Sequence, residues 1–175
     1  MRELGPPEGA EAQIAMKTFS RTLFAAYLLI LLWLVLFKFS YDPIAVLRDF
    51  QTRSLNLIPF TRAQRSEMIS NLVAFIPFGV MLGVNLKHVL CRYKIIAIFA
   101  FSLAVEIIQY ALAIGVADIT DIIMNTLGGV IGLAVYVGLG KHTNDRTLDG
   151  GILVVGTLIL LAILYLRIFV FMIRY

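Results

Sequence analysis

Long runs of apolar residues, separated by short polar stretches, dominate the pattern of this chain. A membrane core of roughly 30 Å takes about 20 helical residues to cross. Runs of that length cover residues 19–39, 69–88, 95–114, 121–139 and 152–172. The pattern therefore predicts an all-α fold, a polytopic transmembrane helical bundle of about five spans, which forms a single domain over residues 1–175.

Composition supports this prediction, because 60% of the 175 residues are hydrophobic and only 15% are charged. A soluble domain of this size could not bury so much apolar surface. The first run is long and lacks a small-residue cleavage site, so we interpret it as a retained anchor. The net charge is +4, but the basic residues lie in separate short loops, so we expect no nucleic acid as a partner.

The loop between the first two spans has its own pattern. Ile44, Leu47 and Phe50 are spaced about one helical turn apart, which predicts a short helix at the membrane interface. The segment SLNLIPF (54–60) is apolar but too short to span a membrane. We expect it either to cap the polar cluster described next, as a re-entrant or interfacial segment, or to be an ordinary loop on the membrane surface.

Polar side chains interrupt the third and fourth apolar runs. Such groups are costly inside a membrane and usually mark function. Because alternate spans run in the same direction, the starts of spans 2 and 4 and the ends of spans 3 and 5 share one half of the membrane. The cluster predicted there comprises Asn71, Glu106, Gln109, Asp118, Asp121, Asn125 and Arg167.

Glu106 is the member of this cluster closest to the middle of the membrane. A rise of 1.5 Å per residue places it roughly 12 Å below the end of span 3. A carboxyl at that depth must be protonated, paired or exposed to water. Arg167 lies at a similar depth in span 5 and is our candidate partner.

The other polar residues have a structural interpretation as well. Asp118 or Asp121 could cap the amino terminus of span 4, where backbone N–H groups lack partners. Asn125 and Gln109 could form hydrogen bonds between helices, which contribute only about 0.6 kcal/mol on average in bilayers. Both interpretations stay open from the sequence alone.

Small residues predict which helices are neighbours. Gly79 and Gly83 in span 2, and Gly128 and Gly132 in span 4, have the spacing that lets two helix backbones approach closely. We therefore expect spans 2 and 4 to pack together. Pro77 cannot donate a backbone hydrogen bond, so we expect a kink near the middle of span 2.

The basic residues favour one orientation. If the amino terminus is inside, slightly more Lys and Arg residues fall on the inner side than on the outer side. By the positive-inside rule we expect a cytoplasmic amino terminus. The polar cluster would then lie toward the outer face of the membrane.

Four ordered motifs resemble those of the VanZ-like family. They are SLNLIPF (54–60), NLVAFIPFGVMLG (71–83), EIIQ (106–109) and GVADITDIIMNTLGGVIG (115–132). The resemblance covers nearly the whole chain. It implies a multi-pass protein of the bacterial cytoplasmic membrane, similar to one that lowers susceptibility to teicoplanin, a lipid-tailed glycopeptide that acts on cell-wall precursors.

The resemblance also implies which residues form the family motif. These are Asn71, Pro77, Gly79, Glu106, Gln109, Asp118, Asp121, Asn125 and Gly128. Many family members carry an arginine a few residues before the first aspartate of the DITD-type motif, where this chain has Gly115 and Ala117. Arg167 is a candidate substitute for that missing cation.

Three classes of function are compatible with these features. The first is a non-enzymatic protein whose outward polar pocket binds a ligand or lipid headgroup and hinders a lipoglycopeptide at the membrane surface. The second is a metal-dependent enzyme acting on an envelope lipid intermediate, in which Asp118 and Asp121 hold a divalent cation and Glu106 is the acid or base. The third is a small transporter in which Glu106 carries protons.

The expected partners follow from the first class. They are membrane lipids together with a lipoglycopeptide or a cell-wall lipid precursor, and we expect no cofactor. The glycine-lined helix faces would also allow a homo-oligomer.

Overall fold

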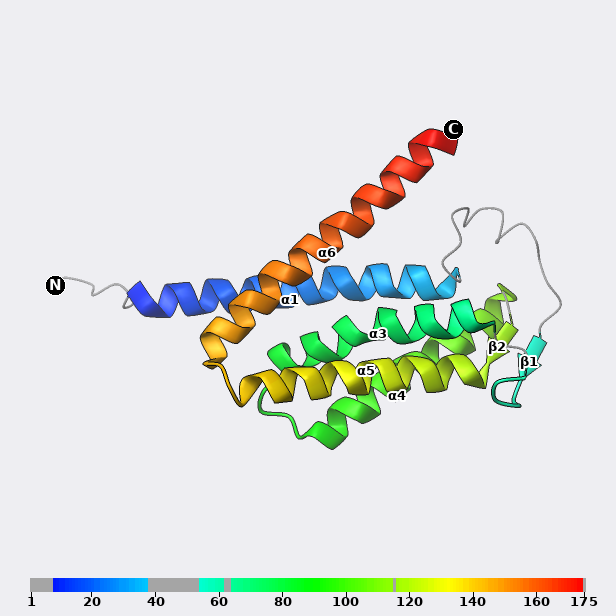
Figure 1. Cartoon of the computed structure of the whole chain (residues 1–175), viewed down its shortest axis with the longest axis horizontal. Helices are drawn as coiled ribbons and strands as arrows, with labels where there is room; N and C mark the ends of the chain where they lie inside the picture. Colours follow the sequence, from blue (N-terminus) through cyan, green and yellow to red (C-terminus); the bar gives the residue numbers. More distant parts are fainter. Residues whose placement is uncertain (1–7, 38–53, 62–63, 115, 175) are drawn as a thin grey trace.

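The computed structural model describes residues 8–37, 54–61, 64–114 and 116–174 (Figure 1). These residues form the helices α1 (Glu8–Leu36), α3 (Arg65–Asn85), α4 (Cys91–Leu112), α5 (Ile119–Gly140) and α6 (Asp145–Arg174), and the strands β1 (Ser54–Asn56) and β2 (Val116–Asp118). Each of the five helices is long and apolar enough to cross a membrane. The predicted all-α bundle of five spans is therefore confirmed.

The bounds of all five helices differ from the predicted spans, most of all where two of the helices begin. Helix α1 begins at Glu8 rather than at residue 19, and α6 begins at Asp145 rather than at residue 152. Hydropathy marks only the part of a helix that suits lipid. Good helix formers such as Ala, Glu, Gln and Lys extend α1 beyond that part, whereas the added segment of α6, DRTLDGG, begins with Asp145, whose carboxylate is favourable in the first turn. The helix predicted at residues 44–50 lies outside the described residues.

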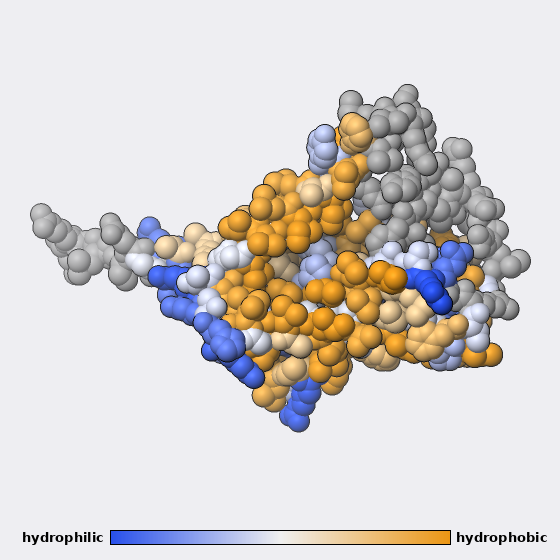
Figure 2. Space-filling view, viewed as in Figure 1, coloured by the Kyte–Doolittle hydropathy of each residue, from blue (hydrophilic) through white to orange (hydrophobic). Residues whose placement is uncertain are grey.

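Successive helices run in opposite directions, so α1, α4 and α6 point one way and α3 and α5 the other (Figure 1). Figure 2 shows a band of hydrophobic side chains across the bundle, with hydrophilic residues gathered toward the ends of the helices. This distribution suits a bundle whose middle faces lipid and whose ends face water. The protein is thus a multi-pass membrane protein by its architecture.

The backbones of α3 and α5 are in direct contact. A Cβ atom added at Gly79 would lie 1.9 Å from the carbonyl oxygen of Gly129, and one at Gly132 would lie 1.9 Å from the carbonyl oxygen of Ile76. A Cβ at Gly128 would lie 2.1 Å from another carbonyl oxygen of α3. Any side chain at these positions would force the helices apart, which confirms that spans 2 and 4 are neighbours.

Two further glycines make room for side chains of neighbouring helices. A Cβ at Gly83 would lie 2.4 Å from the ring of Tyr136 on α5, and one at Gly129 would lie 2.5 Å from Ile98 on α4. Gly129 was absent from the small-residue pattern that we used. Its contact shows that α5 offers glycine surface to α4 as well as to α3.

Helix α1 covers the groove between α3 and α4. Buried aromatic and aliphatic side chains, among them Phe75 of α3 and Ile98 of α4, form the main core with it. The hydroxyl of Tyr27 on α1 donates to the carbonyl of Ala74, in the helical turn before Pro77. Helix α3 continues through Pro77, and the kink that we expected there stays a prediction.

The strands β1 and β2 pair in parallel at the end of the bundle where α4 ends and α5 begins. Ser54 lies opposite Val116, and Asn56 lies opposite Asp118. The sequence did not predict this pair, because three residues are too few to show a strand period. The pairing also joins segments about 60 residues apart, which no local pattern reveals.

The α3–α5 contact can be tested with a matched pair of glycine substitutions on α5. Gly132→Ala places a methyl group against backbone and should lower the free energy of unfolding by about 2 kcal/mol or more. Gly138→Ala meets nothing within 4 Å and should raise it by up to about 1 kcal/mol, because alanine is the better helix former. Unfolding of the purified protein in mixed detergent micelles measures both. Equal stability of the two variants would contradict the close approach.

Candidate functional site

Buried polar side chains gather where α4 ends and α5 begins. We call them the polar network: Asn56, Ser102, Glu106, Gln109, Asp118, Thr120, Asp121 and Asn125, all between 0% and 6% exposed. They come from β1, α4, β2 and α5. Most of the predicted cluster is therefore brought together, in the half of the bundle that the span directions indicated.

Asp118 lies at the centre of the polar network. Its Oδ1 accepts from the backbone N–H of Thr120 at 2.8 Å, and its Oδ2 accepts from Nδ2 of Asn56 at 2.9 Å. Its own backbone N–H donates to Oε2 of Glu106 at 2.8 Å. Asp118 is thus the N-cap of α5, and it also ties α5 to β1 and to α4.

The segment after β1 folds back onto the start of α5. The backbone N–H of Phe60 donates to Oγ1 of Thr120 at 3.0 Å, and that of Ile58 donates to Oδ1 of Asn56 at 3.2 Å. The SLNLIPF segment therefore lies against the polar network, as one of our two expectations had it. It does so as a strand followed by a turn.

Two amides connect the polar network to neighbouring helices. Nδ2 of Asn125 donates to Oγ of Ser102 at 3.0 Å, which joins α5 to α4. Nε2 of Gln109 donates to the carbonyl of Val35 at 3.0 Å and to that of Leu36 at 3.4 Å. These carbonyls belong to the last turn of α1, where the helix itself supplies no donors. Both amides form hydrogen bonds between helices, as the structural interpretation anticipated.

Some acceptors in this region have no hydrogen-bond partner within the described ranges. They include Oε1 of Gln109, Oδ1 of Asn125 and Oγ1 of Thr126 on α5. Leaving a buried polar atom without a partner costs about 1–3 kcal/mol. The interior of the bundle thus keeps capacity to accept further hydrogen bonds beside the polar network.

The remaining predicted residues are placed as follows. Asp121 is buried in the first turn of α5. Asn71 is buried near the start of α3, but its side chain makes no hydrogen bond to another described residue. The side chain of Arg167 lies outside the described part of the chain, so its pairing with Glu106 stays a prediction. Among the described residues, no group of three or more His, Cys, Asp or Glu is arranged to hold a metal ion.

Three members of the polar network escaped the sequence analysis. Ser102 lies one helical turn before Glu106 on α4, so a search for polar residues at helical spacing would have found it. Thr120 sits inside the DITD motif between the two aspartates. Asn56 joins through the pairing of β1 with β2, which the sequence did not reveal.

Five membrane-length helices around a buried polar network define a small polytopic membrane protein. A family model described as VanZ/LLP1 matches residues 24–140, and the chain belongs to this family. It is 47% identical over 152 residues to Protein VanZ of Enterococcus faecium, a match that covers 86% of this chain and 94% of that protein. No solved structure matches the chain significantly.

The contact between Asn56 and Asp118 can be tested by exchanging donor and acceptor. Asp118→Asn places two donors against each other, and Asn56→Asp places two carboxylates against each other. Each change should lower the free energy of unfolding by about 1–3 kcal/mol. The two changes combined restore a donor and an acceptor, and they should recover most of that loss.

Unfolding in mixed micelles measures the four proteins of this cycle. Asn144→Asp is the matched control, because the Oδ1 of Asn144 caps a backbone N–H in an exposed turn and is retained as a carboxylate oxygen. It should leave stability nearly unchanged. Additive losses in the double variant would show that the two side chains are not paired.

Proposed function

We propose that this chain lowers the susceptibility of a bacterium to teicoplanin, without catalysing a reaction, at the outer face of the cytoplasmic membrane. The membership of the VanZ/LLP1 family and the similarity to Protein VanZ support the drug phenotype. The orientation expected from the basic residues supports the outer face, because it puts the polar network and β1 on that side.

The observation that carries the proposal is an exposed apolar turn resting on the polar network. We define the apolar turn as residues 54–61, and its large side chains Leu55, Leu57, Ile58 and Phe60 are 55–65% exposed. Its backbone is meanwhile held by Asn56, Asp118 and Thr120. Apolar side chains at the end of a membrane bundle insert into the headgroup region. In this proposal the polar network holds an apolar surface at that depth.

The backbone of Phe60 supports a functional role for this surface. Phe60 has φ of 63°, in the left-handed region that bulky residues rarely adopt. Such a conformation costs on the order of 1–3 kcal/mol and persists only where its surroundings impose it. Here the hydrogen bond from the Phe60 N–H to Thr120 contributes to holding it. A glycine would fit this position without strain, yet the chain keeps an exposed aromatic ring there.

The chemistry of teicoplanin fits such a surface. Its lipid tail lies in the same boundary layer of the membrane as the apolar turn would. Contact between the tail and the turn hinders the drug from reaching its cell-wall target, whereas a glycopeptide without a tail offers no such contact. The polar network contributes by fixing the turn rather than by acting as an acid, a base or a proton carrier.

Substitutions in the apolar turn should affect resistance to teicoplanin, which has a lipid tail, but not to vancomycin, which has none. Leu57→Ser with Ile58→Ser should reduce teicoplanin resistance by at least about tenfold, since burying even one such side chain contributes about 1.5–3 kcal/mol and about 1.4 kcal/mol is a factor of ten. Vancomycin susceptibility should not change. The measurement is the inhibitory concentration of each drug in cells with matched amounts of the protein in the membrane.

The matched control is Leu90→Ser. Leu90 is 58% exposed at the opposite end of the bundle, just before α4. This change should leave teicoplanin resistance intact. Full resistance of the apolar-turn variant, or an equal loss with Leu90→Ser, would refute a specific role of the turn.

Two substitutions of Glu106 distinguish a network that only supports the apolar turn from one that catalyses a reaction or carries protons. Glu106→Gln keeps an oxygen that accepts from the backbone N–H of Asp118, so most of the resistance should remain. Glu106→Leu removes the acceptor and leaves that buried N–H unpaired, at a cost of about 1–3 kcal/mol, so resistance should fall. The comparison uses the same drug assay, with membrane expression checked by immunoblot. A complete loss with Glu106→Gln would instead favour acid–base chemistry at this carboxyl.

A further inference from the structure

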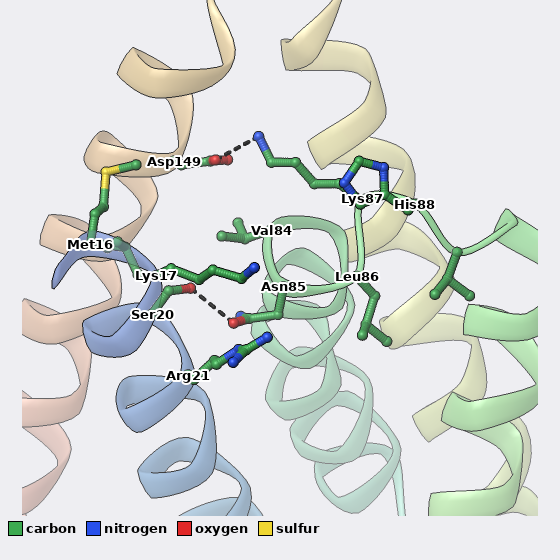
Figure 3. A pocket seen from close by; sticks show the side chains of 12 residues that line it. Met16, Lys17, Ser20, Arg21, Val84, Asn85, Leu86, Lys87, His88 and Asp149 are labelled. Atoms are coloured by element: carbon green, nitrogen blue, oxygen red, sulfur yellow. Dashed lines mark hydrogen bonds and ion pairs between the residues drawn. The ribbon is translucent and has the colours of Figure 1, made fainter. Parts of the chain in front are cut away.

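A second polar feature lies at the opposite end of the bundle from the polar network. It is a pocket of about 390 Å³ between the first part of α1, the end of α3 with the loop that follows it, and the start of α6 (Figure 3). This volume is within the range of small-ligand sites. From the sequence alone, the basic residues of this region indicated only the orientation of the chain in the membrane.

Two cations on α1 line this pocket. Lys17 and Arg21 lie four residues apart on one helix face, and both extend toward Asn85 of α3 (Figure 3). In the described parts of the chain, neither has a carboxylate oxygen within 4.0 Å. Like charges one turn apart on a helix repel each other. An anion between them would remove that repulsion.

Asp149, the acid that lines the pocket, already has partners within the protein. Asp149 of α6 binds Nζ of Lys87 at 2.6 Å and accepts from the hydroxyl of Tyr136 at 3.2 Å, and Lys87 also binds Asp145 at 2.9 Å. Partial burial lowers the pKa of Lys87, but its hydrogen bonds to Asp149 and Asp145 outweigh that effect and raise the pKa above its ordinary value. Lys87 therefore stays charged and neutralises Asp149. No other acid among the described residues lines the pocket to neutralise Lys17 and Arg21.

The pocket has an oriented polar wall and an apolar wall. Oγ of Ser20 donates to Oδ1 of Asn85 at 3.0 Å, and Nδ2 of Asn85 donates to the carbonyl of Met81 at 2.9 Å. Leu86 and Val89 line the same pocket and are 36% and 37% exposed. A ligand of this pocket would therefore meet cations on one side and apolar side chains on the other. That combination matches an amphiphile rather than a sugar or a metal ion.

We propose that this pocket binds a phosphate group, carried by an anionic lipid whose chain lies along Leu86 and Val89. Guanidinium and ammonium groups both bind phosphate oxygens strongly, and Arg21 can engage two of them at once. Basic pockets between membrane helices meet lipid phosphates at the interface. The orientation expected from the sequence would place this site at the inner leaflet.

Binding of short-chain phosphatidylglycerol to the purified protein in detergent tests the proposal. Calorimetry should show saturable binding to the wild type and no binding of the matching diacylglycerol, which lacks phosphate. The double variant Lys17→Gln with Arg21→Gln should bind at least about tenfold more weakly. Lys141→Gln with Arg146→Gln is the matched control, because it removes the same charges from exposed positions at the same end of the protein. It should bind as the wild type does.

Inorganic phosphate is the second arm of the experiment. Binding of phosphatidylglycerol that is clearly tighter than that of phosphate identifies a lipid as the source of the group. Equal binding of both, lost in the pocket variant, supports the phosphate site but assigns it to a soluble anion. The proposal is overturned if neither ligand binds saturably, if diacylglycerol binds as well as the lipid, or if the control pair loses as much affinity as the pocket pair. Thermal unfolding of each variant confirms that it is folded.

Discussion

The close approach of α3 and α5 is the constraint on which the polar network depends. Where Gly79, Gly128 and Gly132 meet the facing helix, backbone touches backbone, so the two helices have one separation and one register. Gly129, which also lies on α5, leaves room for Ile98 of α4 to pack against this helix. The hydrogen bonds between α4 and the start of α5 are 2.8–3.0 Å long. A shift of even 1 Å between these helices would break them, because hydrogen bonds weaken steeply beyond their normal length.

Lipid changes what holds such helices together. Burying apolar side chains provides little drive between helices when the surrounding lipid is equally apolar, so packing and hydrogen bonds take its place. The polar network supplies those bonds, and Asp118 alone takes part in three of them. Polar residues in apolar sequence, which first indicate a site for chemistry, are here in large part architectural. In the function that we propose, they act by holding the apolar turn in place.

The fold was largely predictable because, in a helical membrane protein, local sequence patterns indicate where the helices lie and which of them are neighbours. Hydropathy located the five spans, their alternating directions gathered Glu106 and Asp118 at one end, and glycine spacing paired α3 with α5. The pairing of β1 with β2 was not predictable, since it depends on a contact between segments far apart in the chain. The left-handed backbone of Phe60 escaped for a related reason. No residue type at this position predicts it, and the hydrogen bond to Thr120 that contributes to holding it joins segments far apart in the chain.

Helix α1 shows how the two ends of the molecule are linked. At its last turn the carbonyl of Val35 accepts from Gln109, and nearer its start Ser20 donates to Asn85. Between these points its contacts with α3 and α4 are mostly apolar, apart from the hydrogen bond from Tyr27 to Ala74, and apolar contacts alone would allow it to slide or rotate. A polar contact at each end fixes both motions, since hydrogen bonds are directional and apolar contacts are not. The same contact between Ser20 and Asn85 orients the face of α1 that carries Lys17 and Arg21. It therefore contributes both to the packing of α1 on α3 and to the shape of the pocket that these two cations line.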